Sequence, residues 1–201
     1  MSNRSYKKVQ GLHRDHRTFV IIAEGQREDE YFQYFNGKST RFRIISVERH
    51  ENASAPKHFL KRLEHLKESE VWIPKEQDVI WFVLDIDRWK RAEIDELINY
   101  CKNDGSLHIA ISNPCFEVWL FYHILNDLDD TGTNLKHELH LKTEGTGYNP
   151  NDFCPLIYTA ITNAKQKDTN SNHLYPNEKE TKVYLLAEQL LEKLGRNWSK
   201  Y

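Results

Sequence analysis

Val79 to Leu84 reads VIWFVL, an unbroken apolar run that ends abruptly at Asp85-Ile86-Asp87. A second run of this kind, TFVIIA, covers Thr18 to Ala23. Strands without polar alternation are typical of sheets that are covered on both faces, and in parallel sheets helices provide that cover. These two runs therefore predict that the chain folds around a parallel sheet with helices on both sides.

Candidate strands and helices alternate along the chain. Strands are expected at 18–23, 42–47, 79–84 and 107–111, and helices at 27–35, 55–69, 90–102, 114–125 and 135–141. In the fourth long helix, Asn113 is the expected N-cap and Pro114 the first helical residue. Alternation of this kind predicts an α/β fold, Rossmann-like, with right-handed crossovers and a mostly parallel sheet of about four strands. Extra C-terminal helices are expected at 152–165 and 178–194.

Composition excludes several classes of protein. The 201 residues carry 28 Lys+Arg and 30 Asp+Glu, a formal net charge of −2, which argues against coating nucleic acid by bulk positive charge. This length suits one domain, expected at 18–201 after a flexible basic segment at 1–17, with 127–150 as a polar insert or loop. The chain has three cysteines without a CxxC pair and no apolar run of ~20 residues. We therefore expect a cytoplasmic protein with no membrane contact.

Acidic residues follow several of the predicted strands. Glu24 comes directly after the first strand, Asp85 and Asp87 after the third, and Glu117 after the fourth. Because the carboxyl ends of parallel strands lie along one edge of a sheet, these residues are expected to meet there. Asp85 and Asp87 are two residues apart, so in an extended chain their side chains project the same way. Glu28, four residues after Glu24, is placed to face the same crevice.

Converging carboxylates repel one another, and a hard divalent cation such as Mg²⁺ or Mn²⁺ removes that conflict. One or two such ions can activate water for phosphodiester cleavage. Each acid also has a simpler interpretation, since Asp87 could cap the next helix and Glu117 could complement a helix dipole. Glu28 could likewise be part of a solvated first turn. Capping or a solvated turn explains less well why Glu24 and the pair Asp85 and Asp87 follow the ends of two different strands.

Three strings resemble the motifs of the RloB-like family. AEGQREDEYF at 23–32 resembles the family's EGxTExxYF opening, and WFVLDID at 81–87 resembles its strand ending in DxD. ISNPCFEVWL at 111–120 is similar to its SNPCFExWL segment and is the most specific of the three. NEKETKV at 177–183 resembles a closing NPxTxV stretch more weakly. The resemblance spans residues 18–194, nearly the whole chain.

The resemblance implies a fold and a biological setting. RloB-like proteins are bacterial and archaeal, are linked to restriction loci and to anti-phage or abortive-infection systems, and often occur beside an AAA-type ATPase. Their core is similar to a Toprim domain, the metal-dependent fold of topoisomerases, primases and OLD-type nucleases. This chain departs from the family pattern at Arg27, where threonine is usual, and at Glu178, where proline is usual. Neither departure changes a carboxylate.

Carried over by this resemblance, Glu24, Asp85 and Asp87 stand where a Toprim domain holds its metal, while the roles of Glu28 and Glu117 stay open. The implied activity is an Mg²⁺- or Mn²⁺-dependent nuclease acting on RNA or DNA in phage defence. Nucleotidyl transfer would use the same site. The alternative is a non-catalytic Toprim-like effector that binds an AAA-type ATPase encoded alongside.

Residues outside the acidic set are candidates for binding the substrate. Ser112 and Asn113 could contact a phosphate or a metal-bound water, although capping of the fourth helix explains Asn113 equally well. Lys165 and Lys182 could supply positive charge that the acidic edge lacks. As surface lysines they would need no special role.

Overall fold

We describe the protein from a computed structural model. It describes residues 16–47, 56–87, 89–129, 132, 134–143, 145, 147–195 and 198. The predicted flexible segment at 1–17 lies outside the described residues except for His16 and Arg17, and Arg17 is the first residue of a strand.

The sheet has four strands, all parallel: β1 (Arg17–Ala23), β2 (Phe42–Ser46), β3 (Val79–Asp85) and β4 (Leu107–Ser112). Their order across the sheet is β2-β1-β3-β4. The predicted strands and the predicted α/β fold with a parallel sheet are therefore confirmed. β3 is buried along its whole length, which explains why its sequence shows no polar alternation.

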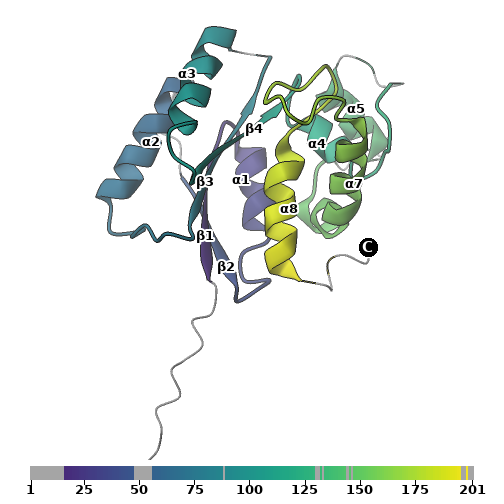
Figure 1. Ribbon diagram of the computed structural model, residues 1–201. Coiled ribbons are helices and arrows are strands. Elements are labelled where there is room, and N and C mark those ends of the chain that lie inside the picture. The colour runs from purple at the N-terminus through teal and green to yellow at the C-terminus, as the bar shows by residue number, and fades with distance from the viewer. Residues whose placement is uncertain are drawn as a thin grey trace, which may run out of the picture.

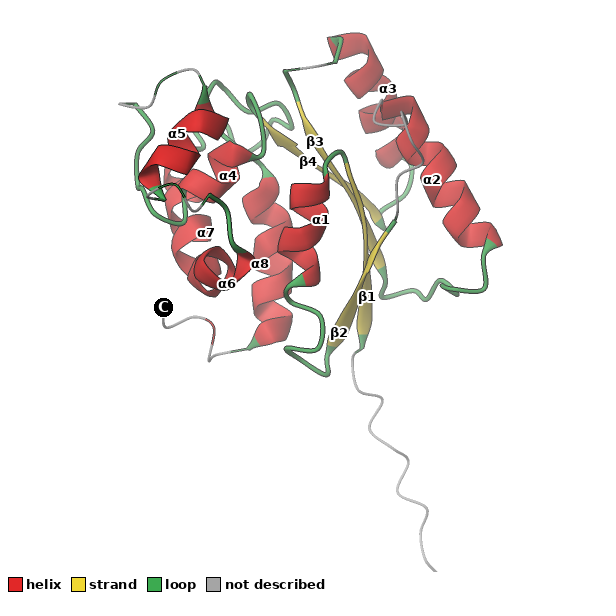
Figure 2. Cartoon of the chain, turned by 180° about the vertical axis from the view of Figure 1, so that it is seen from behind, coloured by secondary structure: helices red, strands yellow, loops and turns green. Residues whose placement is uncertain are grey.

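Helices cover both faces of the sheet (Figure 1). On one face lie α2 (Pro56–Glu68) and α3 (Arg91–Cys101), and on the other lie α1 (Gln26–Gln33) and α8 (Val183–Leu194). Figure 2 shows the same layers from behind, with the shorter C-terminal helices stacked outside α1 and α8. These are α4 (Glu117–Phe121), α5 (Leu135–Lys142), α6 (Pro150–Phe153), the 3₁₀ turn η1 (Cys154–Leu156) and α7 (Ile157–Lys167).

Alternating strand residues supply two separate cores. Phe19 and Ile21 of β1 pack with the layer of α1 and α8, whereas Val20 and Ile22 pack with α2 and α3. This division follows from the strand geometry, because successive side chains point to opposite faces. The first core also takes in the aromatic residues of α1, including Tyr31, so α1 is fixed directly above the end of β1.

Two expected C-terminal helices have different bounds in the structure. The helix expected at 152–165 is divided into α6, η1 and α7, and Pro155 lies in the 3₁₀ turn, where its missing N–H group interrupts a regular α-helix. The helix expected at 178–194 begins only at Val183. Residues before it are held in extended contact with β4, since Ser112 and Thr181 form an antiparallel bridge.

The fourth long helix was also expected to begin earlier than it does. α4 begins at Glu117 with Phe116 as its N-cap, so the prediction that Asn113 caps this helix is wrong. The Asn113 backbone N–H donates to the Glu180 carbonyl oxygen at 3.0 Å, and its side-chain amide donates to the Pro176 carbonyl oxygen at 3.1 Å. Contacts with residues distant in sequence therefore hold Asn113 in place ahead of α4.

Within the part of the chain that the structure describes, no helix is long and apolar enough to cross a membrane. All three cysteines are free and buried.

Candidate functional site

β1 and β3 are neighbours in the sheet, and the edge where the strands end is here called the carboxyl edge. From β1 the chain passes through α1 to β2 on one side, and from β3 it passes through α3 to β4 on the other. Neighbouring strands whose connections leave in opposite directions form a switch point, where open α/β sheets bind ligands. Glu24 follows β1 and Asp85 ends β3, so both lie at this point.

Glu24 is held in place by two donors. Its side chain is buried, and Oε2 accepts hydrogen bonds from the Asp85 backbone N–H at 3.1 Å and from the Trp89 indole Nε1–H at 2.9 Å. The Glu24 backbone N–H donates to the Val83 carbonyl oxygen at 3.0 Å. The two strand ends are thus joined through one carboxylate, which fixes its position relative to β3.

Glu28 lies at the start of α1 and is buried, with 4% of its surface exposed. Burial is the main reason that its pKa rises to about 7, and the neighbouring carboxylates of Glu117, Glu24 and Asp29 raise it further. The carboxylate packs against Gly25, because a Cβ atom built on Gly25 would lie 2.3 Å from Glu28 Oε2. Glycine at this position therefore leaves the room that the Glu28 side chain occupies.

Asp85 lies at the centre of the acidic residues. Its pKa is raised well above its usual value, first by burial and then by the negative charge of Glu28, Glu24, Glu117 and Asp87. Asp87 is exposed and lies in a turn, since β3 ends at Asp85. The expectation that both side chains project the same way assumed an extended chain beyond the strand, and the turn at Asp87 replaces it. Asp87 stays near enough for its charge to act on Asp85.

Glu117, the first residue of α4, is paired with a cation. Its carboxylate accepts a hydrogen bond from Arg27 Nη1 in a salt bridge, and its side chain is only 3% exposed, against 41% for Arg27. The neighbouring Cys115 thiol has its pKa raised by burial and by the Glu117 charge, so Cys115 is a poor nucleophile. The structure thus brings all five predicted acids, Glu24, Glu28, Asp85, Asp87 and Glu117, to one edge.

The chemistry of these side chains suits a hard divalent cation, which prefers carboxylate oxygens. Burial and the neighbouring carboxylates raise the pKa values of Glu28 and Asp85, which means that ionisation of these groups is unfavourable. A bound cation would favour their ionised forms. Among the residues that the structure describes, no three Asp, Glu, His or Cys side chains are already arranged as a metal-binding group. Binding at this edge would therefore require carboxylates to move, and Glu117 to loosen its contact with Arg27.

Ser112 and Asn113 lie at the end of β4 and are held by the segment 168–182, here called the strap. Ser112 Oγ lies 2.8 Å from Thr181 Oγ1, and the Lys182 backbone N–H donates to the Ile111 carbonyl oxygen at 2.8 Å. Pairing of this kind places the third and the closing family-like motifs side by side. Both predicted substrate contacts are thus engaged within the protein, and their predicted role remains open.

The strap has its own buried polar contacts. Glu180 is 7% exposed, and its carboxylate accepts hydrogen bonds from Thr169 Oγ1 at 3.0 Å and from the Asn177 backbone N–H at 2.9 Å. Earlier in the strap, the Tyr175 hydroxyl donates to Asp95 Oδ1 of α3 at 2.7 Å. The strap therefore leaves α7, contacts α3 and then pairs with the end of β4.

The two predicted lysines are both paired. Lys165 on α7 forms a 2.6 Å ion pair with Glu188 of α8 and is well exposed. Lys182 is buried with Asp168, each side chain being 1% exposed, and its Nζ lies 2.6 Å and 2.5 Å from the two carboxylate oxygens of Asp168. Lys182 Nζ also donates to the Asn170 carbonyl oxygen at 2.9 Å. These contacts give Lys182 a structural role in holding the strap. Substrate binding by either lysine remains a prediction.

Sequence reasoning missed two residues of the acidic site. Arg27 was noted only as a departure from a family motif, and no local pattern indicated that it pairs with Glu117, 90 residues away. Trp89 is the second missed residue, and its indole N–H donates to the Glu24 carboxylate. Its place four residues after Asp85 was the available signal.

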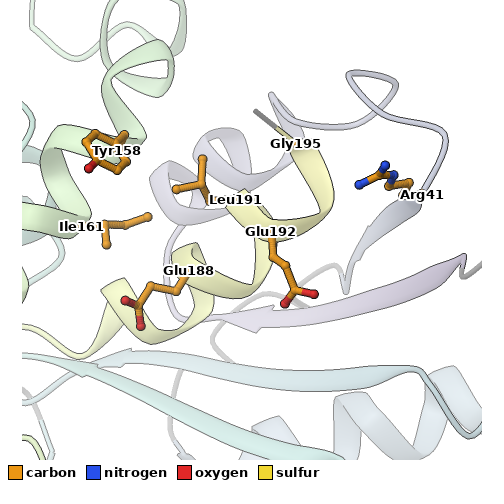
Figure 3. Close-up of a pocket in the computed structure, with 7 residues that line it drawn as sticks. All are labelled: Arg41, Tyr158, Ile161, Glu188, Leu191, Glu192 and Gly195. Atoms are coloured by element: carbon orange, nitrogen blue, oxygen red, sulfur yellow. The ribbon is translucent and has the colours of Figure 1, made fainter. Parts of the chain in front are cut away.

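A separate hollow of about 650 Å³ lies between α7, α8 and the residues before β2. Figure 3 shows its lining: Arg41, Tyr158, Ile161, Glu188, Leu191, Glu192 and Gly195. It lies at the C-terminal end of α8, opposite the end that adjoins β4. None of the five acids at the carboxyl edge lines it.

The fold and the site define an open, parallel α/β protein with buried carboxylates at its switch point. The sequence profile of a family described as RloB-like protein matches residues 19–190. The chain therefore belongs to the RloB-like family, as its motifs indicated. Comparison with curated proteins and with solved structures gave no match.

Proposed function

We propose that this protein is an Mg²⁺- or Mn²⁺-dependent nuclease that hydrolyses phosphodiester bonds of RNA or DNA in bacterial anti-phage or abortive-infection defence. One observation carries the proposal: Glu24, Glu28, Asp85 and Glu117 are buried together at the β1/β3 switch point, where burial and the neighbouring negative charges raise the pKa of Glu28 and of Asp85. The chain belongs to the RloB-like family. This membership supports the proposed defence role, because RloB-like proteins are linked to restriction loci and to anti-phage or abortive-infection systems.

In this proposal Glu24 and Asp85 hold the metal, with Asp87 or Glu117 completing the set. A bound divalent cation supplies charge neutralisation and water activation in phosphodiester hydrolysis. Trp89 and the Asp85 backbone N–H orient Glu24, so one oxygen of its carboxylate is fixed before any ligand arrives. This orientation limits the rearrangement that binding would require.

Glu28 suits proton transfer in the same proposal. A pKa of about 7 means that its carboxyl group exchanges a proton near neutral pH, which favours general acid–base catalysis. Gly25 leaves its Oε2 against the backbone at the start of α1. Glu28 would therefore take a proton at this oxygen when the attacking water loses one.

The test is a cleavage assay on labelled RNA and DNA, with Mg²⁺, Mn²⁺ or chelator, alone and with the neighbouring ATPase. We expect cleavage only with metal, and its loss in Asp85→Asn and Asp85→Ala. Glu96→Gln, on the exposed face of α3, removes one acid elsewhere and should cleave as the wild type does. Equal cleavage by the Asp85 variants would contradict the proposal. A stable complex with the ATPase, without cleavage or Mn²⁺ binding, would favour the non-catalytic effector instead.

A further inference from the structure

We propose that Arg27 is the cationic residue that contacts the substrate phosphate, and that its ion pair with Glu117 is a resting state that the divalent cation opens. This inference rests on the proposed function and adds the residue that links metal binding to substrate binding. It starts from the salt bridge between Arg27 of α1 and Glu117 of α4.

The two partners differ in freedom. Glu117 is 3% exposed and stays in the acidic site, whereas the Arg27 side chain is 41% exposed and already reaches solvent. A long side chain that is already partly exposed can turn its charged end outward, and a guanidinium is hydrated when it leaves a carboxylate. Opening of the pair would therefore move Arg27 and leave Glu117 in place.

In this proposal the Glu117 carboxylate pairs either with Arg27 or with the divalent metal ion. Glu117 is buried, as Glu24, Glu28 and Asp85 are, and its negative charge acts on Glu28 and on Asp85, so it lies close to the proposed metal ligands. A divalent ion bound among them would attract Glu117 and repel the guanidinium. Metal and Arg27 therefore compete, and metal binding would release Arg27 at the rim of the site.

A released guanidinium suits a nucleic-acid phosphate. Its planar donors bind phosphate oxygens in pairs, which a lysine cannot reproduce. The acids around it repel phosphate until a metal is bound, so exposure of the phosphate contact would coincide with neutralisation of the site. Substrate binding would then depend on metal through one side chain.

The experiment measures Mn²⁺ binding by calorimetry, and binding of a labelled phosphorothioate oligonucleotide by anisotropy with Mn²⁺ present. The variants are Arg27→Thr, which installs the residue usual in the motif, and Arg27→Lys. Lys167→Thr is the matched control, because Lys167 is a partly exposed cation paired with Asp127 on a different part of the surface. Melting temperatures show that each variant is folded.

We expect Arg27→Thr to bind Mn²⁺ about fivefold more tightly, because a competing ion pair is removed. The same variant should bind the oligonucleotide about tenfold more weakly. Arg27→Lys should lie between wild type and Arg27→Thr in both measurements, and Lys167→Thr should match the wild type.

Unchanged or weaker Mn²⁺ binding by Arg27→Thr would overturn the inference, and so would oligonucleotide binding equal to that of the wild type. If the wild type and Arg27→Thr bind Mn²⁺ equally well, the metal site stands and only the role of Arg27 is rejected. If neither binds Mn²⁺, the proposed function fails and the inference fails with it.

Discussion

Replacing Glu28 with glutamine should stabilise the metal-free protein at alkaline pH. The folded-state pKa of Glu28 is about 7, against a usual value of 4.5. Between these values the folded protein keeps a proton that the unfolded chain has released, so the free energy of unfolding falls as the pH rises and levels off above pH 7. At about 1.4 kcal/mol per pH unit, the loss is about 3 kcal/mol. Glutamine has nearly the same shape and carries no charge, so it escapes this loss.

The assay is urea unfolding in chelator, followed by tryptophan fluorescence, at about pH 5 and about pH 8. We expect Glu28→Gln to gain about 2–3 kcal/mol over the wild type between the two pH values. Comparing the two conditions cancels any pH-independent effect of the amide. Glu96→Gln, an exposed change of equal charge, should show a difference below about 0.5 kcal/mol. A Glu28→Gln gain no larger than that of Glu96→Gln would refute the view that the acidic site is under electrostatic strain.

Three other predictions concern Gly25, Lys182 and His123. Gly25→Ala should fold with nearly normal stability, because φ is −120°, but the new Cβ would displace Glu28 Oε2 and reduce metal-dependent cleavage. Lys182→Met should lower the free energy of unfolding by about 3–5 kcal/mol in urea titrations, since it leaves Asp168 buried without its cation, and Lys182→Met with Asp168→Leu should recover most of the loss. Burial lowers the pKa of His123 to about 4, so ¹⁵N spectra should show a neutral ring at about pH 6, protonated at the Nδ1 that faces the Trp119 carbonyl oxygen. A double variant as unstable as Lys182→Met would contradict the prediction for Lys182. A charged imidazole ring at about pH 6 would contradict the prediction for His123.

The strands were predictable because their signal is local. VIWFVL is apolar over its whole length and TFVIIA is apolar after Thr18. Such runs by themselves predict a sheet that is covered on both faces. Most helices followed from apolar spacing for the same reason. The acids that end β1 and β3 could also be placed at one edge, because all parallel strands end on the same side.

The first residues of α4 and α8 were not predictable from local patterns, because contacts with residues distant in sequence decide where these helices begin. Asn113 has the chemistry of a helix cap, yet Glu180 and Pro176 use its hydrogen-bonding groups. The residues before Val183 have helical spacing, yet Thr181 bridges to Ser112. In both cases a tertiary contact with the strap competes with a local preference of about 1 kcal/mol and prevails.

The sequence by itself determined that this chain forms a parallel α/β sheet with carboxylates at the strand ends, because hydrophobic periodicity and strand direction suffice for that conclusion. Only the tertiary structure decided that β1 and β3 are neighbours at the switch point, which brings the acids close enough together to raise the pKa of Glu28 and of Asp85. It also decided that Arg27 meets Glu117 across 90 residues and that Lys182 is buried with Asp168. Burial and charge pairing depend on which side chains meet in space, and spacing along the chain does not specify that.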